Sequence, residues 1–242
     1  ASSHVRVGTF QFFAARGDTE ALTLLVQSVI ERTYPTLATR ENPPLALLEA
    51  VIGRQAALIA DWMNVGFIHG VMNTDNMAVS GETIDFGPCA FMDAYDPVQV
   101  FSSIDHMGRY AYGNQPRIAQ WNLARLAETL LPLIDPDGEK AVALATDAIG
   151  TFPQRFEAAV TTGLRRKLGL LTERDGDLAL AQDLLQVMAA NGADFTLAFR
   201  RLGDDPESLR ELFATTGGID SWIERWRARL AEEPGRDDER RE

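Results

Sequence analysis

The spacing of apolar side chains along the chain predicts one short strand followed by helices. Residues 4–13, His-Val-Arg-Val-Gly-Thr-Phe-Gln-Phe-Phe, alternate and are rich in β-branched and aromatic side chains, which predicts a strand leading into a short turn. Asp18 stands where an N-cap residue is expected, ahead of a helical stripe at 22–30. Pro43 begins a second helix, whose apolar stripe runs over 45–62.

The pattern changes in the middle of the chain and then becomes helical again. Residues 77–85 predict two short strands around a Ser80-Gly81 turn. Residues 88–115 mix Gly, Pro, Tyr and Ser in irregular order and predict a long loop. Periodic apolar positions then predict helices over 118–134, 141–149, 152–170, 178–188 and 219–230.

These patterns predict a mostly α fold with one small β-hairpin, an α+β arrangement. This is the layout of a protein-kinase-like C-lobe followed by a helical extension, although helical domains of many kinds share it. We expect residues 1–135 to form the kinase-like core, with the N-lobe largely missing. Residues 136–231 would form a helical C-terminal region, and the charged tail at 232–242 is expected to be disordered.

Composition narrows the classes of partner. The 242 residues include 35 Asp and Glu against 23 Lys and Arg, a formal charge of -12. Because non-specific nucleic-acid binding needs a basic surface, we expect no nucleic-acid partner. A bound nucleotide stays possible, since a divalent metal masks a local carboxylate cluster. No uninterrupted apolar run reaches about 18 residues, so we expect no membrane-spanning helix.

Cysteine usage bears on the compartment. The single cysteine, Cys89, has no partner for an internal disulfide, which indicates a reducing environment such as the cytoplasm. The first residue is Ala rather than Met, so we expect a fragment or a processed product. Organellar targeting by a missing N-terminus therefore stays open.

The segment from His69 to Gly87 carries the side chains that suit nucleotide chemistry. Mg²⁺ prefers oxygen ligands and keeps several waters, so proteins supply only one or two carboxylates or amides. Asn76 lies just before the first strand of the predicted hairpin, and Asp85 lies just after the second. We therefore expect Asn76 and Asp85 to lie side by side as ligands of a divalent metal.

The same segment departs from ordinary phosphotransferases at one position. Their catalytic loop has His-Gly-Asp, four residues and Asn, followed later by Ile-Asp-Phe-Gly. This chain keeps the spacing but has Val71 in place of the catalytic Asp. Valine cannot accept a proton, so either the chain is inactive or Asp75, beside Asn76, is the base. An isolated Asp-Phe-Gly string occurs by chance, but here order, spacing and hairpin agree.

At this point the sequence resembles a known family, the selenoprotein O (YdiU-type) pseudokinases. The resemblance is dense up to about residue 135 and diffuse in the later helices. It is carried by Ser3-His-Val-Arg-Val-Gly-Thr-Phe10, Gly66-Phe-Ile-His-Gly-Val-Met-Asn-Thr-Asp-Asn-Met77, Thr83-Ile-Asp-Phe-Gly-Pro88, Phe91-Met-Asp-Ala-Tyr-Asp-Pro97, Ser103-Ile-Asp-His-Met-Gly-Arg-Tyr-Ala-Tyr112 and Asn114-Gln-Pro-Arg-Ile-Ala-Gln-Trp-Asn-Leu-Ala-Arg-Leu126.

The resemblance implies a protein adenylyltransferase with a kinase-like fold that binds ATP in a reversed orientation. Such an enzyme transfers AMP to hydroxyl side chains (Ser, Thr or Tyr) of target proteins and releases pyrophosphate; UMP transfer from UTP with Mn²⁺ has been proposed for bacterial members. By motif match Asp75 would be the base, Asn76 and Asp85 the ligands of Mg²⁺ or Mn²⁺, and Arg6 a grip on the outer phosphates. Without the resemblance, the sequence favours Arg6 as a surface charge on an edge strand.

The resemblance also shows what this chain does not contain. The family's glycine-rich loop, its lysine with an acidic partner, and a second phosphate-binding arginine lie upstream of residue 1. We therefore expect a C-terminal portion of a family member, which is inactive alone if those groups are indispensable. Two other functions stay open: a non-catalytic nucleotide-binding pseudokinase scaffold, and a small-molecule phosphotransferase, against which Val71 argues.

Overall fold

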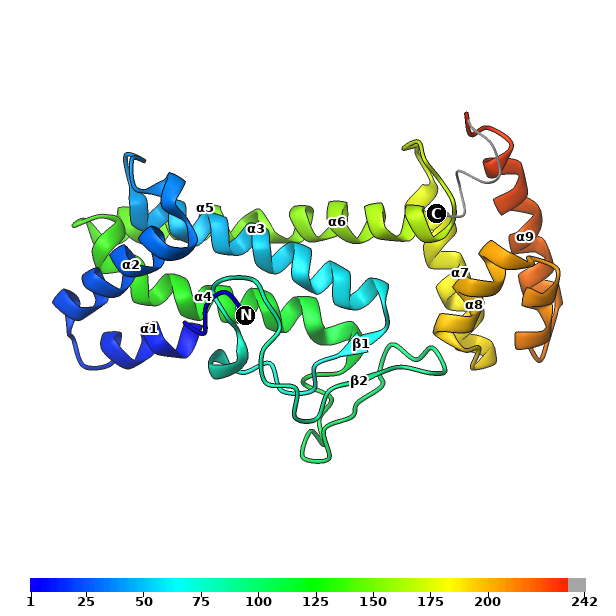
Figure 1. Ribbon diagram of the computed structural model, residues 1–242, viewed down its shortest axis with the longest axis horizontal. Coiled ribbons are helices and arrows are strands. Elements are labelled where there is room, and N and C mark those ends of the chain that lie inside the picture. Colours follow the sequence, from blue (N-terminus) through cyan, green and yellow to red (C-terminus); the bar gives the residue numbers. More distant parts are fainter. Residues whose placement is uncertain (235–242) are drawn as a thin grey trace.

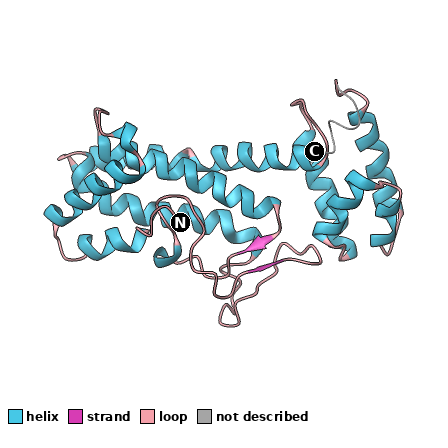
Figure 2. Cartoon of the chain, in the orientation of Figure 1, coloured by secondary structure: helices cyan, strands magenta, loops and turns pink. Residues whose placement is uncertain are grey.

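The computed structural model describes residues 1–234 and consists mostly of helices (Figures 1 and 2). The α-helices are α1 (Val7–Ala14), α2 (Thr19–Thr33), α3 (Pro43–Asn64), α4 (Gln115–Ile134), α5 (Gly138–Gly150), α6 (Phe152–Lys167), α7 (Asp177–Asn191), α8 (Phe195–Asp204) and α9 (Gly217–Leu230). Short 3-10 turns are η1 (Pro35–Leu37), η2 (Thr74–Asn76), η3 (Tyr112–Asn114) and η4 (Ser208–Leu212). Strands β1 (Phe67–Ile68) and β2 (Ala90–Phe91) pair antiparallel. The mostly α class with a small antiparallel element is confirmed, while the kinase-like relation stays a prediction.

The long helix α3 is the central element of the elongated molecule. It packs against α6, α4 and α5, and its side chains at Leu47, Val51 and Ile59 are fully buried. Figure 1 shows α1 and α2 at one end and α7, α8 and α9 at the other. Within residues 1–234, α3 alone is long and apolar enough to cross a membrane by length and composition. Its packing on three other helices is what a core helix of a globular protein requires.

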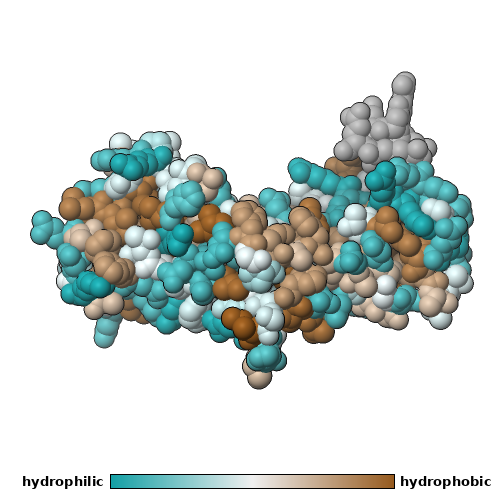
Figure 3. All heavy atoms as spheres, turned by 60° about the horizontal axis from the view of Figure 1, so that its bottom comes forward, coloured by the Kyte–Doolittle hydropathy of each residue, from teal (hydrophilic) through white to brown (hydrophobic). Residues whose placement is uncertain are grey.

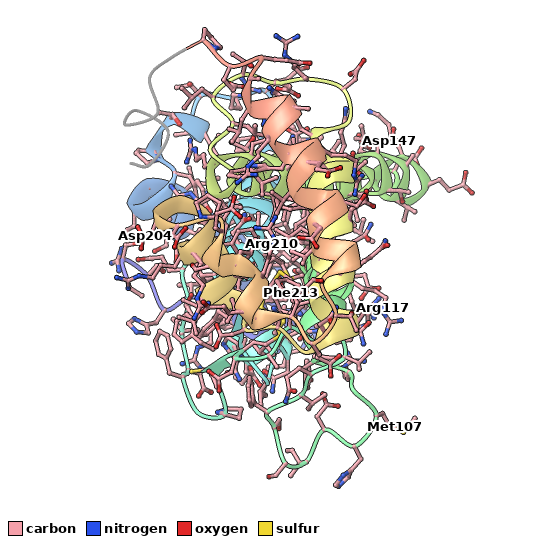
Figure 4. The ribbon with its side chains drawn as sticks, turned by 90° about the vertical axis from the view of Figure 1, so that its right-hand side faces the viewer. Met107, Arg117, Asp147, Asp204, Arg210 and Phe213 are labelled. Atoms are coloured by element: carbon pink, nitrogen blue, oxygen red, sulfur yellow. The ribbon has the colours of Figure 1, made fainter. Side chains whose placement is uncertain are left out.

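Two hydrophobic cores meet along α6. The first core includes Phe152 at the start of α6, and the second includes Leu164 near its end. Met63, at the end of α3, packs against both. Phe213, labelled in Figure 4, belongs to the second core. The predicted division of the chain after residue 135 stays a prediction, and most of the predicted tail (235–242) lies outside the described residues.

The strand predicted over residues 4–13 is wrong. Only the backbone around Arg6 is extended, and the chain enters α1 at Val7. The aromatic sequence fits a helix because Val7 and Phe10, one turn apart, are both buried. The Thr9 hydroxyl accepts a hydrogen bond from the Arg6 N–H at 3.2 Å and so stabilises the first turn. Packing of α1 on α4 and α2 therefore outweighs the β-propensity of these side chains.

The predicted hairpin at 77–85 is confirmed as a chain reversal but not as two strands. A single antiparallel bridge joins Met77 to Thr83. Gly81 closes the turn at φ 71°, where a Cβ atom would lie 2.5 Å from Cβ of Arg54. The close approach of α3 therefore requires glycine in this turn.

Sequence signals at helix starts predict the structure better than the strand patterns do. The Asp18 carboxylate accepts a hydrogen bond from the Ala21 N–H at 2.9 Å, as an N-cap should, and α3 begins at Pro43 as predicted. Helix α8 was not predicted, although Asp194 caps it through the Leu197 N–H at 2.7 Å. The loop predicted over 88–115 is confirmed, apart from β2 and η3.

Candidate functional site

The backbone on either side of Arg6 is hydrogen-bonded to a segment in the middle of the chain. The Val7 N–H donates to the Met77 carbonyl at 3.0 Å, and the Val79 N–H donates to the Val5 carbonyl at 2.9 Å, so that Arg6 pairs with Ala78. The guanidinium Nε of Arg6 is buried and has no hydrogen-bond partner among residues 1–234. A buried donor without a partner is costly unless a ligand or water accepts from it.

Asp75 lies over the start of α1. It belongs to η2, whose cap is the Asn73 side chain, which accepts from the Asp75 N–H at 3.0 Å. A Cβ atom on Gly8 would lie 2.2 Å from the Asp75 Oδ1 oxygen. Glycine is therefore required at this position for the carboxylate to approach the helix. The exposed carboxylate has no hydrogen bond or ion pair within residues 1–234.

Asn76 is buried beside Val71. Its Nδ2 donates to the Val71 carbonyl at 3.0 Å, which fixes the amide and leaves its Oδ1 as an acceptor. Val71 thus contributes its backbone to the site. The Val71 side chain, which occupies the position of the phosphotransferase base, is apolar and can neither donate nor accept a hydrogen bond.

His69 ties the loop around Val71 to the segment that carries Asp85. The imidazole is fully buried, and its Nε2 donates to the Ile84 carbonyl at 2.8 Å, because a carbonyl can only accept. The other nitrogen, Nδ1, therefore lacks a proton and faces the Val71 N–H at 3.4 Å. Burial lowers the pKa of His69, which keeps the ring neutral. His69 is a structural tie in this arrangement.

Asp85 has an unusual backbone. Its φ of 60° makes it the single non-glycine residue with positive φ in the described part of the chain. Asp adopts this region more readily than most residues, yet the conformation still costs about 1 kcal/mol. The exposed carboxylate makes no hydrogen bond or ion pair within residues 1–234. Strain held at an unpaired carboxylate is typical of a functional position.

Arg6 and Asp85 line the same cavity. Its volume is about 450 Å³, and it is completed by Ala1, His4, Thr83, Ile84 and Phe86. The fold therefore brings together a guanidinium group and a carboxylate that lie far apart in the sequence. Asp75 approaches Gly8, two residues after Arg6, and Asn76 precedes the Met77–Thr83 bridge that leads to Asp85. Of the four predicted site residues, Arg6 and Asp85 line this cavity, whereas Asp75 and Asn76 are not among its lining residues.

The donor set suits a hard divalent cation. No group of three or more His, Cys, Asp or Glu side chains that could hold a metal occurs in residues 1–234. Asn76 and Asp85 would instead supply one amide oxygen and one carboxylate. Mg²⁺ is commonly held by one or two such ligands together with phosphate oxygens and waters, and Mn²⁺ accepts similar oxygen ligands.

Two residues that support the site were not predicted. Gln115 accepts from the His69 N–H through Oε1 at 3.0 Å and donates through Nε2 to the Phe67 carbonyl at 3.0 Å. Asn122 donates to the Met72 carbonyl at 2.9 Å. Both are buried on α4, seven residues apart. Two amides on an otherwise apolar helix face are a sequence signal that could have found them.

Comparison with known proteins identifies the family to which the chain is similar. Residues 1–234 match the family described as protein adenylyltransferase SelO. The protein nucleotidyltransferase YdiU of Bradyrhizobium diazoefficiens is 63% identical over 239 residues, which cover 97% of this chain and 49% of that protein. Proteins of the same name from Methylorubrum populi (62% over 247 residues) and Rhizobium meliloti (60% over 240 residues) are similar, with 97% of this chain and 50% and 49% of theirs covered.

The chain spans about half the length of the curated relatives that it matches. The family match over residues 1–234 spans the candidate site. The chain therefore belongs to the SelO family of protein adenylyltransferases.

Proposed function

We propose that the protein transfers a nucleoside monophosphate from a metal-bound triphosphate to hydroxyl side chains of other proteins. ATP is the proposed donor, with UTP as the alternative, and Ser, Thr or Tyr hydroxyls are the acceptors. Family membership supports the reaction class. The observation that carries the assignment to this chain is the cavity shared by Arg6 and Asp85. It offers a cation for phosphate oxygens and a carboxylate for a metal ion in one place.

Asn76 and Asp85 are the proposed metal ligands. The Asn76 amide is held by the Val71 carbonyl with its oxygen available, and the Asp85 carboxylate is unpaired within the described residues. Bound Mg²⁺ or Mn²⁺ would polarise the phosphate oxygens and neutralise charge that develops on them. His69 keeps both ligand segments in register through its contact with the Ile84 carbonyl.

The proposed transfer uses two further residues. The acceptor hydroxyl oxygen attacks the α-phosphorus and forms a new P–O bond, while the bond from that phosphorus to the oxygen bridging the α- and β-phosphates breaks. Pyrophosphate leaves with the bonding electrons. Asp75 takes the proton from the hydroxyl, which its unpaired carboxylate beside Gly8 allows. Arg6 stabilises the negative charge on the departing pyrophosphate.

The two alternative functions make different demands on the site. A small-molecule phosphotransferase needs a carboxylate at position 71, where this chain has Val71 with its backbone engaged by Asn76 and His69. A non-catalytic scaffold needs no base, so it does not explain an unpaired Asp75 held against Gly8. The geometry therefore favours nucleotide transfer.

Radiolabelled donors test the proposal directly. The chain is incubated with Mg²⁺ or Mn²⁺, protein acceptors and ATP labelled on either the α- or the γ-phosphate; α-labelled UTP tests the alternative donor. We expect α-label on protein, and loss of that label in Asp75→Ala. Transfer of γ-label would indicate phosphotransfer. Nucleotide binding without transfer of either label would indicate the scaffold.

A further inference from the structure

An exposed tryptophan on α4 lies between arginine side chains. Trp121 is 39% exposed, whereas the chain's other tryptophans are at most 6% exposed. The guanidinium carbon of Arg109 lies 4.8 Å from the Trp121 ring centroid, and that of Arg125 lies 5.5 Å away. Such contacts hold the ring and the cations in fixed positions at the surface.

The charges on this surface are only partly neutralised. Arg117 and Arg125 flank Trp121 at helical spacing, so these three residues share one face of α4. Arg125 pairs with Glu128 at 2.5 Å, but Arg109 and Arg117 are exposed and have no ion pair within residues 1–234. The nearby Asp105 carboxylate already accepts hydrogen bonds from the Arg109 and Tyr110 N–H groups, at 2.8 Å each. Three arginines therefore stand against two nearby carboxylates, Asp105 and Glu128, which leaves a local excess of one positive charge on a chain whose formal charge is -12.

Apolar side chains project from the loop beside this basic surface. Val98, Ile104 and Met107 are 72%, 79% and 91% exposed. The loop is closed at its base by hydrogen bonds from the Tyr112 N–H to the Gln99 carbonyl and from the Gly113 N–H to the Pro97 carbonyl, at 3.1 and 2.8 Å. Figure 4 shows Met107 at the outer end of the loop, and Figure 3 shows hydrophobic side chains on the face from which it projects.

The basic surface is linked to the candidate site through α4. Asn122, the neighbour of Trp121, donates to the carbonyl of Met72, next to Val71. A segment bound over Trp121 would therefore lie one helix face away from the loop that carries Asp75. This position suits a contact that holds a protein while one of its side chains enters the site.

We propose that Arg109, Arg117, Trp121 and Arg125, with the apolar loop beside them, form a docking surface for an acidic protein segment that also carries apolar side chains. Charge complementarity favours this occupant: guanidinium groups pair with carboxylates, and the indole and loop cover apolar atoms. A nucleic acid is disfavoured because its long polyanion would extend over the acidic remainder of the surface. A short acidic segment interacts mainly with charges within a Debye length of about 10 Å, so the acidic remainder of the surface repels it less. Binding of the acidic segment does not depend on nucleotide transfer. A role of this surface in selecting protein substrates rests on the proposed function.

Binding of defined peptides to the 242-residue chain tests this inference. The probe is a short fluorescein-labelled peptide rich in Glu and Leu, followed by fluorescence anisotropy; the comparison peptide has Gln in place of every Glu. We expect the acidic peptide to bind more tightly and to weaken with added salt. Arg109→Ala/Arg125→Ala should weaken it by about tenfold or more, and Trp121→Ala by a similar factor.

A matched control removes the same charge elsewhere. Arg32 on α2 and Arg166 on α6 are exposed and have no ion pair within residues 1–234, so Arg32→Ala/Arg166→Ala should leave binding unchanged. If the first double variant unfolds, Arg109→Gln alone, on the exposed loop, should still weaken binding severalfold. Equal binding of the two peptides, equal loss in both double variants, or tighter binding of a single-stranded oligonucleotide would overturn the proposal. Since no nucleotide is present, these outcomes are independent of transfer activity.

Discussion

At the scale of single residues, His69 is a structural support for side chains that are proposed to do chemistry. Its two ring nitrogens contact the backbone of Ile84 and Val71, one in each segment of the proposed metal site. The ring also lies against Trp62, with centroids 5.3 Å apart. His69, which is conspicuous in the sequence motif, thus acts by holding the segments that carry Asp85 and Asn76.

Replacement of His69 should therefore destabilise the fold. His69→Ala removes a fully buried ring and leaves the Ile84 carbonyl without its partner. We expect a loss of about 3 kcal/mol in the free energy of unfolding, measured by urea titration. The exposed His106 is the control, and His106→Ala should change stability by less than about 0.5 kcal/mol. A similarly small loss for His69→Ala would contradict the structural role.

Gly8 provides a test of the Asp75 position. A methyl group at Gly8 would meet the Asp75 Oδ1 oxygen, whereas one at Gly138, near the start of α5, would meet open space. We expect Gly8→Ala to reduce nucleotide transfer more than tenfold with at most about 1 kcal/mol lost in stability. Gly138→Ala should leave transfer unchanged. Wild-type transfer by Gly8→Ala would show that the carboxylate need not lie there.

The sequence predicted those parts of the site that depend on neighbours along the chain. Asn76 and Asp85 flank a short reversal that the sequence indicated and the Met77–Thr83 bridge confirms, while their convergence as metal ligands stays a prediction. Other contacts join segments that lie far apart in the sequence: Gly8 lies against Asp75, and the Gln115 side chain accepts a hydrogen bond from the His69 N–H. No local pattern encodes such contacts, because they depend on how α1 and α4 pack.

At the scale of elements, helix ends were predictable where one side chain decides them. The Asp18 carboxylate and the ring of Pro43 act within a few residues, and both helices begin as predicted. The opening segment failed because α1 has only 8 residues, too short for a clear period, and is decided by burial of Val7 and Phe10. Helix α8 was missed because its apolar stripe spans only 10 residues.

Lys167 links three helices near the meeting of the two cores. At the end of α6, its ammonium group donates to the carbonyl of Asn64 in α3. It also lies 4.4 and 4.0 Å from the ring centroids of Phe195 and Phe199 in α8. Burial lowers the pKa of Lys167 to about 8.

This lowered pKa predicts a pH dependence of stability. Between pH 8 and the ordinary lysine value of 10.5, the unfolded chain holds a proton that the folded chain has released, so stability rises with pH across this window. Relative to Lys167→Met, the wild-type free energy of unfolding should rise by up to about 3 kcal/mol between these limits. Denaturant titrations across this pH range measure the difference.

Lys140 is the matched control for this titration. It is exposed and pairs with Asp135 at 2.6 Å, which raises its pKa. Lys140→Met should therefore keep the alkaline rise in stability that Lys167 causes. A rise of the same size in Lys167→Met as in the wild type would show that another group is responsible.

At the scale of the whole molecule, the described chain is an elongated helical body with the candidate site on its loop-bearing side. Figure 2 places the small sheet and the long loops together below the α3 and α4 helices. The spacing of apolar residues correctly predicted a mostly helical chain, and its composition makes it acidic. Neither could indicate that arginines collect around Trp121, because that depends on a loop folding back onto α4.

Arg6, Asn76 and Asp85 are proposed to form one metal and nucleotide site in this chain, and calorimetric titration of ATP binding decides whether this claim holds. The chain is titrated with ATP in the presence and absence of Mg²⁺ or Mn²⁺, with Asp85→Ala measured in parallel. We expect metal-dependent binding by the wild type and loss of that dependence in the variant, because the carboxylate is a proposed ligand. No metal-dependent binding by the wild type, or equal binding by Asp85→Ala, would contradict the claim.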